Sequence, residues 1–258
     1  MTSKKDLLVA ELNIKAVFPV LIVLLKDDPK TAAKFKDVNA NVVFRAKHDS
    51  GFIGANLIFN DGELVVEPEP VENGDVIFTF GTVAKMNTFL KGGVALPSIK
   101  GFTNIKLLVN FVSTLLMLKL MMPDVRPKDE HKKYLKVKLA LYMVSTALSK
   151  LNKSGHAEML AWTGRQPDRV YQLSVEGTDI AVYLRVKAGK TKAGRGLYKR
   201  KRPFVHMKFS SIDGALKVLL KDVEFVEAVD KKYVAIEGSP EYAANINDFM
   251  MAIQSLIA

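Results

Sequence analysis

The chain has 258 residues, of which 48% are hydrophobic and 25% charged, and it contains no cysteine. This length and composition predict one large or two ordinary globular domains and exclude a disordered chain. The lack of cysteine excludes disulfide bonds, thiolate catalysis and cysteine-ligated metals. The formal net charge is +11, and residues 129–258 contribute +8 of it (22 Lys+Arg against 14 Asp+Glu), which favours anionic partners.

The chain is predicted to begin with two helices. Apolar residues recur at helical spacing over 6–26, with a kink expected at Pro19. Asp28 and Pro29 then suit the start of a short helix over 30–35, because aspartate caps helix N-termini and proline is favoured at the first position.

Neither long apolar run is predicted to cross a membrane. The run 16–25 contains Pro19 and falls short of the roughly 20 residues that span a bilayer, and the run 107–122 is interrupted by polar residues. Residues 1–6 lack the apolar core of a signal peptide, so the cytoplasm is the expected location.

The rest of the first half predicts a mainly antiparallel sheet followed by an apolar helix. Strands and helices alternate with turn signals, and Asn60-Asp61-Gly62 marks a tight hairpin. Strands are expected at 41–47, 52–59, 63–67, 76–80 and 96–101, with helices at 82–91 and 104–121.

The second half repeats this order. Pro123 and Pro127 indicate a linker, so the boundary is placed near residue 128. Helices are then expected at 130–151, 156–162, 211–221 and 241–257, strands at 170–176, 180–187, 204–209 and 233–238, and a glycine-rich basic loop at 187–202.

The predicted fold class is therefore α+β, with two similar units at 1–128 and 129–258, each a roughly five-stranded, mainly antiparallel sheet covered by helices. Long-period self-similarity is best interpreted as a repeated unit. The competing interpretation is that any two α+β segments look alike.

Two interpretations remain open for the apolar helices that end each half. Helix 104–121 is apolar nearly all round, which is typical of a core or domain-interface helix, or of a helix lining a ligand cavity. Methionines near both terminal helices would adapt to varied apolar ligands. The candidate ligand-binding residues are Met86, Phe89, Leu90, Leu108, Phe111, Val112 and Leu115 in the first unit, and Leu216, Leu219, Ile246, Phe249, Met250 and Ile253 in the second.

The basic loop is the candidate anion-binding element. Its cations repel one another, so one interpretation is a solvated hairpin and the other a site for phosphate, an anionic membrane surface or a nucleic-acid backbone. The candidate residues are Lys199, Arg200, Lys201 and Arg202.

No catalytic or metal-binding motif is found. Gly189-Lys190-Thr191 is not a P-loop, because Leu184 stands where the pattern requires glycine. The four histidines are scattered and no GxSxG motif occurs, so neither a metal site, a cofactor nor a catalytic group is predicted. Trp162 is expected to be a packing residue rather than a stacking platform.

The order of elements resembles the sterol carrier protein 2 domain, a five-stranded sheet and helices around a lipid-holding tunnel. The residues that carry the likeness are 74–80 and Ile99-Lys100-Gly101 in the first unit, and the run from Tyr233 to Tyr242 in the second. The family domain commonly occurs once, so a tandem pair departs from its pattern. The resemblance implies binding of sterols, fatty acids, acyl-CoA or other long apolar molecules without catalysis.

Three functions follow. The first is a cytoplasmic, non-catalytic carrier of a lipid or other long apolar molecule, with the basic loop at an anionic headgroup or membrane surface. The second is a nucleic-acid- or membrane-binding interaction module that uses the basic loop, with nucleic acid the less favoured partner. The third, an enzyme acting on an acyl or steroid substrate, has no residues to support it.

Overall fold

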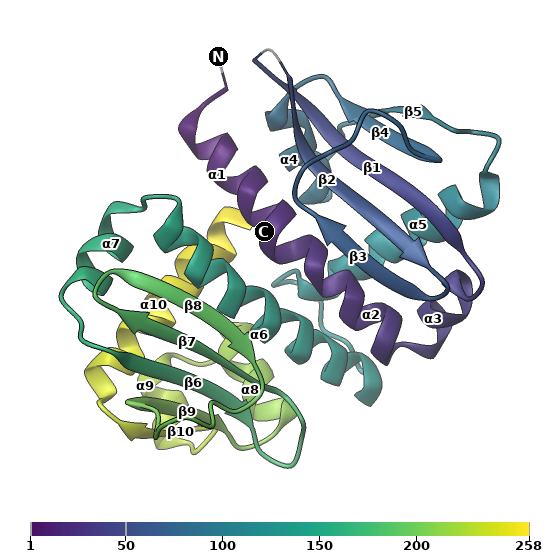
Figure 1. Ribbon diagram of the computed structural model, residues 1–258. Helices are drawn as coiled ribbons and strands as arrows, with labels where there is room; N and C mark the ends of the chain where they lie inside the picture. Colours follow the sequence, from purple (N-terminus) through teal and green to yellow (C-terminus); the bar gives the residue numbers. More distant parts are fainter. Residues whose placement is uncertain (1, 50, 258) are drawn as a thin grey trace. The chain divides into compact units, whose positions relative to one another are not determined.

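The computed structural model describes residues 2–49 and 51–257 and contains two compact units. Unit 1 runs to Lys119 and unit 2 spans Leu120–Leu256. The chain therefore divides between residues 119 and 120, before the boundary that was predicted near residue 128. Each unit contains helices and one five-stranded sheet, which confirms the predicted α+β class (Figure 1).

Unit 1 begins with an interrupted helix. α1 (Lys4–Leu12) is capped by Ser3, whose hydroxyl accepts a hydrogen bond from the Asp6 N–H at 3.0 Å. A π-helical turn (Asn13–Val17) and a 3-10 turn (Phe18–Val20) separate it from α2 (Leu21–Asp27). The 3-10 turn contains Pro19, where a kink was expected, and the regular α-helical pattern stops around it because proline has no N–H to continue the helical hydrogen bonds.

The stretch Lys4–Asp27 is also long and apolar enough to cross a membrane, judged by length and composition alone. Its most apolar window has a mean hydropathy of 2.2, and 67% of that window is buried inside the structure. Such burial is what the core helix of a globular protein shows.

The sheet of unit 1 has the order β3-β2-β1-β4-β5. Its strands are β1 (Asn39–His48), β2 (Gly51–Asn60), β3 (Glu63–Glu67), β4 (Val76–Phe80) and β5 (Ser98–Lys100). All pairings are antiparallel except β1 with β4, which is parallel. The remaining helices are α3 (Pro29–Phe35), α4 (Val83–Leu90) and α5 (Ile105–Met117).

The core of unit 1 is built from phenylalanine rings. Phe44 on β1 lies 5.1 Å from Phe18 and 5.0 Å from Phe80, measured between ring centroids. Phe35 of α3 stacks on Phe59 of β2 at 4.3 Å. Edge and tilted ring contacts of this kind fill the interior efficiently and add to the stabilisation from buried area.

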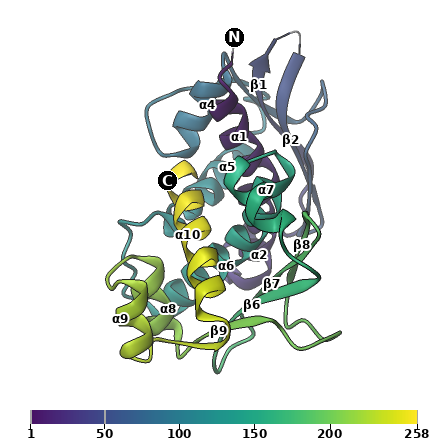
Figure 2. The same ribbon diagram turned by 90° about the vertical axis from the view of Figure 1, so that its left-hand side faces the viewer.

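Unit 2 is organised around a long helix, α6 (Glu130–Lys153). Asp129 caps its N-terminus, because the Asp129 carboxylate accepts a hydrogen bond from the Lys132 N–H at 2.9 Å. Its other helices are α7 (Ala157–Gly164), α8 (Ile212–Leu219), α9 (Phe225–Asp230) and α10 (Pro240–Ile257). Figures 1 and 2 place α6, α8 and α10 on one side of the sheet of unit 2.

The sheet of unit 2 repeats the topology of unit 1, with the order β8-β7-β6-β9-β10 and a single parallel pairing, β6 with β9. Its strands are β6 (Arg169–Val175), β7 (Ala181–Lys187), β8 (Lys190–Arg195), β9 (Val205–Phe209) and β10 (Val234–Gly238). The prediction that both halves contain a similar sheet unit is confirmed.

One predicted element of unit 2 is wrong. The basic loop expected at 187–202 contains strand β8, which pairs antiparallel with β7 from Lys187 opposite Lys190 to Val182 opposite Arg195. Ala188 and Gly189 form the turn between β7 and β8, and the connection from Gly196 to Phe204 is irregular. Strand β8 forms because it is an edge strand, where charged residues are favoured and only one side needs a partner.

Gly238 at the end of β10 and Gly101 after β5 occupy equivalent positions, and at each the backbone of another segment lies too close for a side chain. Gly101 has φ +89° and a Cβ there would lie 1.9 Å from the Asp75 carbonyl oxygen, while Gly238 has φ +101° and a Cβ would lie 2.0 Å from the Phe204 carbonyl oxygen. Both positions therefore require glycine for space and for backbone conformation.

Candidate ligand-binding site

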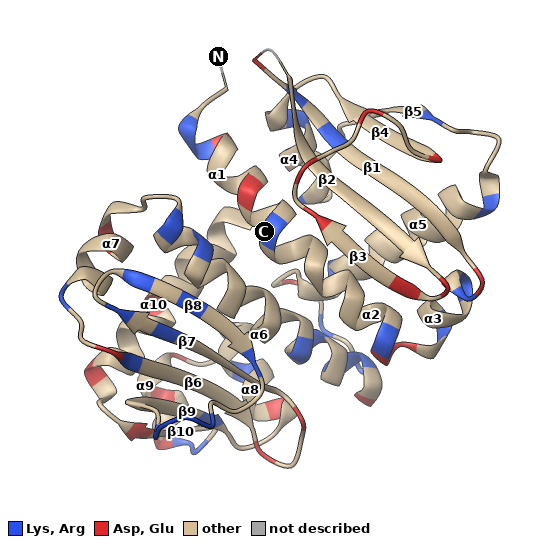
Figure 3. Ribbon diagram, viewed as in Figure 1, with Lys and Arg blue, Asp and Glu red and all other residues tan. Residues whose placement is uncertain are grey.

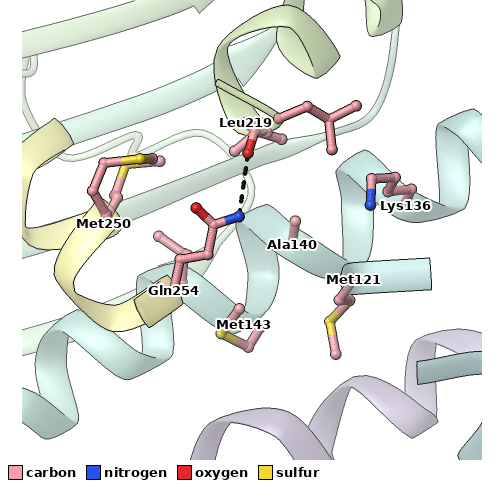
Figure 4. A pocket seen from close by; sticks show the side chains of 10 residues that line it. Met121, Lys136, Ala140, Met143, Leu219, Met250 and Gln254 are labelled. Carbon is pink, nitrogen blue, oxygen red and sulfur yellow. Dashed lines mark hydrogen bonds between the residues drawn. The ribbon is translucent and has the colours of Figure 1, made fainter. Parts of the chain in front are cut away.

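The candidate site is a small apolar cavity of about 30 Å³ in unit 2, between α6, α8 and α10 (Figure 4). Only two of its lining residues are polar, Lys136 and Gln254. The apolar lining residues are Met121, Ala140, Met143, Val144, Leu219, Leu220, Met250 and Met251.

Helical spacing brings the lining residues of α6 onto one face. Lys136, Ala140, Met143 and Val144 are separated by four, seven and eight positions, which lie one above another on an α-helix. Leu219 stands at the end of α8, and Met250, Met251 and Gln254 come from successive turns of α10. Three helices therefore position most of the lining, and Met121 from the 3-10 turn Leu118–Met121 and Leu220, the residue after α8, complete it.

Lys136 places a positive charge beside this apolar cavity. Its side chain is 2% exposed, and its ammonium donates hydrogen bonds to the Leu120 and Met122 carbonyl oxygens, the latter at 2.7 Å. Burial first, and then the charge of Arg126, lower the pKa of Lys136 to about 8, while the charge of Asp124 opposes the shift. Lys136 is therefore still charged at neutral pH, because two carbonyl oxygens solvate an ammonium that burial disfavours.

Gln254 offers a second polar group. Its Nε2 donates a weak hydrogen bond to the Leu219 carbonyl oxygen at 3.4 Å, drawn as a dashed line in Figure 4. Its Oε1 is buried and has no hydrogen-bond partner among the residues that the structure describes. An unsatisfied buried acceptor is costly, so a ligand hydroxyl or acid proton that donated to it would be favoured.

The cavity as it stands is small. A cavity needs about 10–15 Å³ of free volume to hold one water, so the volume of about 30 Å³ fits roughly two waters. Drug-sized ligands occupy sites of about 300–1,000 Å³. A long apolar molecule would enter only if side chains moved. Four of the lining residues are methionines, whose unbranched side chains change rotamer more readily than branched ones.

The predicted ligand-binding residues of unit 2 are partly brought together. Leu219 and Met250 line the cavity, whereas Ile246 and Ile253 of α10 and Leu216 of α8 are buried without lining it. Phe249 lies 5.4 Å from Trp162, whose Nε1–H donates to Asn245 Oδ1 at 2.9 Å. Trp162 thus packs against α10, as expected of a packing residue.

Two of the predicted residues of unit 1 make ring contacts in its phenylalanine core, and the others are buried or half-buried around it. Phe111 of α5 is fully buried, 5.4 Å from Phe78, and Phe89 of α4 lies 5.3 Å from Phe80. Of the others, Met86 and Leu115 are buried and Leu90, Leu108 and Val112 are half-buried.

The sequence interpretation missed most of the cavity lining. Met121 and Met251 belong to the methionine cluster that was noted, but Lys136, Ala140 and Gln254 were not singled out. A signal was present for Lys136, since it shares the helical spacing of Ala140, Met143 and Val144 and so stands on an apolar stripe.

The predicted anion-binding residues fall at a different place in unit 2. Lys199 and Arg200 line a basic recess of about 230 Å³, whereas Lys201 instead pairs with Asp168, their side-chain N and O lying 3.0 Å apart. The other lining residues of the recess are Tyr183, Arg185, Lys192, Arg195, Leu197 and Tyr198.

The basic recess is reached from the sheet face opposite to the helices. Val182, Leu184 and Val186 of β7 are buried toward the helices, so alternation places Tyr183 and Arg185 on the other face. The β8–β9 connection is held over that face by Gln172, which accepts the Tyr198 N–H at 2.8 Å.

Two interactions fix the walls of the basic recess. Tyr183 and Tyr198 meet edge to face at 4.9 Å, and Gly194 leaves room for the Tyr183 ring, because a Cβ there would lie 2.2 Å from Tyr183 Cζ. Arg185 forms a bidentate ion pair with Asp168, at 2.6 Å and 2.8 Å. Hydrogen bonds from Arg185 and Lys201 hold the pKa of Asp168 well below its usual range.

Comparison with known proteins gives no family assignment. No family model matches the chain, and no curated protein matches it. Among solved structures, a protein described as "UbiJ-SCP2 Ubiquinone synthesis protein" is similar over 44% of this chain and 93% of its own, at 10% identity and a TM-score of 0.32.

A second solved structure, the inverting sec-alkylsulfatase Pisa1 from Pseudomonas sp., is similar over 64% of this chain and 31% of its own, at 11% identity and a TM-score of 0.28. A double mutant of the same enzyme gives a TM-score of 0.29 at 10% identity. At these values neither comparison assigns a function. The molecule is defined here by its own architecture, as an α+β protein of two similar sheet units with a methionine-lined cavity in the second.

Proposed function

We propose that this chain is a non-catalytic binding protein for a long apolar small molecule with an acidic end group, of which a fatty acid is the simplest example. The observation that carries the proposal is the cavity of unit 2, where four methionines surround a space bordered by the buried ammonium of Lys136. The sequence resemblance to lipid-holding domains agrees with this proposal but does not carry it.

The two parts of such a ligand would be stabilised differently. Each methylene moved from water into the methionine-lined space contributes about 0.8 kcal/mol, less the cost of opening the cavity. A carboxylate beside the Lys136 ammonium would form a charge-assisted hydrogen bond in a site with little water, which is roughly twice as strong as a neutral one. The apolar part supplies affinity and Lys136 supplies selectivity for the acid.

The experiment compares a long-chain fatty acid with the fatty alcohol of the same length. Protein purified without detergent is extracted under denaturing conditions and the extract is analysed by mass spectrometry for bound lipid. Delipidated protein is then titrated with a fluorescent fatty-acid probe, which the acid and the alcohol displace in turn. The proposal expects displacement by both ligands, with the acid binding at least about tenfold more tightly.

Two variants and one control test the location. Ala140→Leu fills the cavity and should abolish probe binding, while Ala161→Leu, an equal change at an exposed position of α7, should leave it intact. Lys136→Met should remove the preference for the acid and keep binding of the alcohol. If the wild-type protein bound no probe, or if Ala140→Leu and Ala161→Leu bound it equally well, this cavity would hold no such ligand.

A second candidate function has one observation in its favour. The basic recess carries Lys192, Lys199 and Arg200, none of which forms an ion pair with an acid within residues 2–49 and 51–257. An interaction module that binds an anionic polymer there would show binding that falls steeply with salt. Titration of a labelled single-stranded oligonucleotide at several salt concentrations, with a Lys199→Ser/Arg200→Ser variant, decides whether this module exists.

A further inference from the structure

Unit 1 exposes a group of large apolar side chains in one stretch of the chain. They are Val94 and Leu96 before β5, Phe102 after it, and Ile105 and Val109 on α5, here called the α5 surface. Between 59% and 97% of each residue is exposed. A single exposed apolar residue is ordinary, but five within sixteen positions indicate a surface that meets something other than water.

Helix α5 explains why this surface cannot be hidden in the core of unit 1. Its buried positions include Leu107, Phe111 and Leu115, which face the sheet. Ile105 and Val109 are one turn apart on another side, and Leu116, 53% exposed, continues the same side two turns later. The helix is therefore apolar on its exposed side as well as on its buried side.

The stretch of sequence that carries the α5 surface has charges of one sign only. The acid Asp75, whose backbone lies against Gly101, has its carboxylate engaged by the Asn41 N–H at 2.7 Å. Residues 76–123 contain no aspartate or glutamate, although 27 acids in 258 residues would put about five in a stretch of that length. The same stretch contains lysines 85, 91, 100, 106 and 119. Lys100 in β5 and Lys106 in α5 are exposed and stand close in the sequence to Phe102 and Ile105. Figure 3 shows basic residues in blue along this part of unit 1.

We infer that the α5 surface docks on an anionic phospholipid membrane. Apolar side chains flanked by lysines are what a peripheral protein presents to the headgroup region, where the apolar groups enter the acyl boundary and the lysines meet phosphates. A symmetric contact with a second copy of the chain is disfavoured, because it would bring the lysines of both copies together with no acid from residues 76–123 to offset them.

This inference is independent of the proposed cargo. It concerns unit 1 and phospholipid at a bilayer surface, whereas the proposed ligand-binding site lies in unit 2. It also differs from docking through the basic recess, since Lys199 and Arg200 belong to another element. Delipidated protein and the Ala140→Leu variant should therefore bind vesicles as well as the wild-type protein does.

The test is co-sedimentation with vesicles of phosphatidylcholine, with and without phosphatidylserine. Wild-type protein should bind the mixed vesicles, bind pure phosphatidylcholine weakly, and release as salt is raised. Lys100→Ser/Lys106→Ser should lower the partition coefficient roughly 30-fold, since each lysine near an anionic surface contributes about fivefold. Phe102→Ser/Ile105→Ser/Val109→Ser should reduce binding to the level seen with pure phosphatidylcholine.

Matched variants control for composition. Val226→Ser removes an apolar residue that is 73% exposed on α9, and Lys199→Ser/Arg200→Ser removes two cations from the basic recess. Both should bind mixed vesicles like the wild type, and thermal unfolding followed by circular dichroism confirms that every variant is folded. Failure of the wild type to bind, an equal loss in the controls, or a shift in oligomeric state from the apolar variant with unchanged vesicle binding would each overturn the inference.

Discussion

The buried charge of Lys136 should make the stability of this protein depend on pH in the alkaline range. The perturbation is Lys136→Met, which keeps an unbranched side chain of similar length and removes the ammonium. Burial lowers the pKa of Lys136 from an ordinary value of 10.5 to about 8 in the folded protein. Between these two values the unfolded chain binds more protons than the folded chain, so the free energy of unfolding rises with pH.

The size of the effect follows from the two pKa values. The difference between a pKa of 10.5 in the unfolded chain and about 8 in the folded protein corresponds to about 3 kcal/mol of unfolding free energy, at 1.36 kcal/mol for each tenfold change in proton affinity. Below about pH 8 Lys136 is protonated in both states and its cost is constant. The wild type should therefore gain about 3 kcal/mol relative to Lys136→Met between about pH 7 and about pH 10.5.

The assay is urea unfolding followed by the fluorescence of Trp162, the single tryptophan, at a series of pH values. Burial also raises the pKa of Tyr171, which costs stability at the alkaline end, but this contribution is common to both proteins and cancels in the difference. Lys153→Met, at an exposed position of the same helix, is the control and should run parallel to the wild type. The Leu120 and Met122 carbonyl groups lose their hydrogen-bond donor in Lys136→Met, which changes the free energy of unfolding by the same amount at every pH. A difference that stays flat or falls with rising pH would refute the reasoning.

Two further predictions concern backbone positions and the basic recess. Gly101→Ala and Gly238→Ala should each lower the free energy of unfolding, measured in urea, by roughly 3 kcal/mol or more, because the added Cβ meets a carbonyl oxygen and the backbone φ is positive. Gly62→Ala, at a position with positive φ but open space, should lower it by only about 1 kcal/mol. Equal losses for all three variants would contradict the steric argument. Asp168→Asn should increase the initial rate of tryptic cleavage in the β8–β9 connection several-fold, because the carboxylate ties Lys201 of that connection to Arg185 of β7. The cleavage sites are mapped by mass spectrometry, and cleavage no faster than in an Asp230→Asn control would contradict this.

The fold was predictable where turn chemistry and periodicity act locally. The hairpin at Asn60-Asp61-Gly62 was recognised because its backbone needs positive φ, which Asp61 (46°) and Gly62 (84°) adopt. Strands β1 to β4 were placed close to their observed ends for the same reason. The parallel pairing of β1 with β4 was not predictable from such signals, because it depends on a long connection rather than on a turn.

Strand β8 and the cavity were missed for opposite reasons. Lys190–Arg195 presents mainly lysine, glycine and arginine, and only its pairing with β7 makes it a strand, so no periodic apolar signal exists to detect. Lys136 lies on a clear apolar stripe, but a lysine is normally taken as a sign of a solvent-exposed face. Its burial depends on the Leu120 and Met122 carbonyl oxygens, which come from a segment outside helix α6.

The two units show how one topology can carry different surfaces. Helices α5 and α10 follow equivalent strands, β5 and β10, and are both rich in apolar residues. In unit 2 one face of α10 is buried and Met250 on it lines the cavity with Lys136, whereas in unit 1 phenylalanines fill the space behind α5 and Ile105 and Val109 on its other side reach solvent. Since the equivalent helix lines a cavity in one unit and exposes apolar side chains in the other, backbone topology alone does not decide whether a unit encloses a ligand or meets a surface. The side chains that fill the interior decide it.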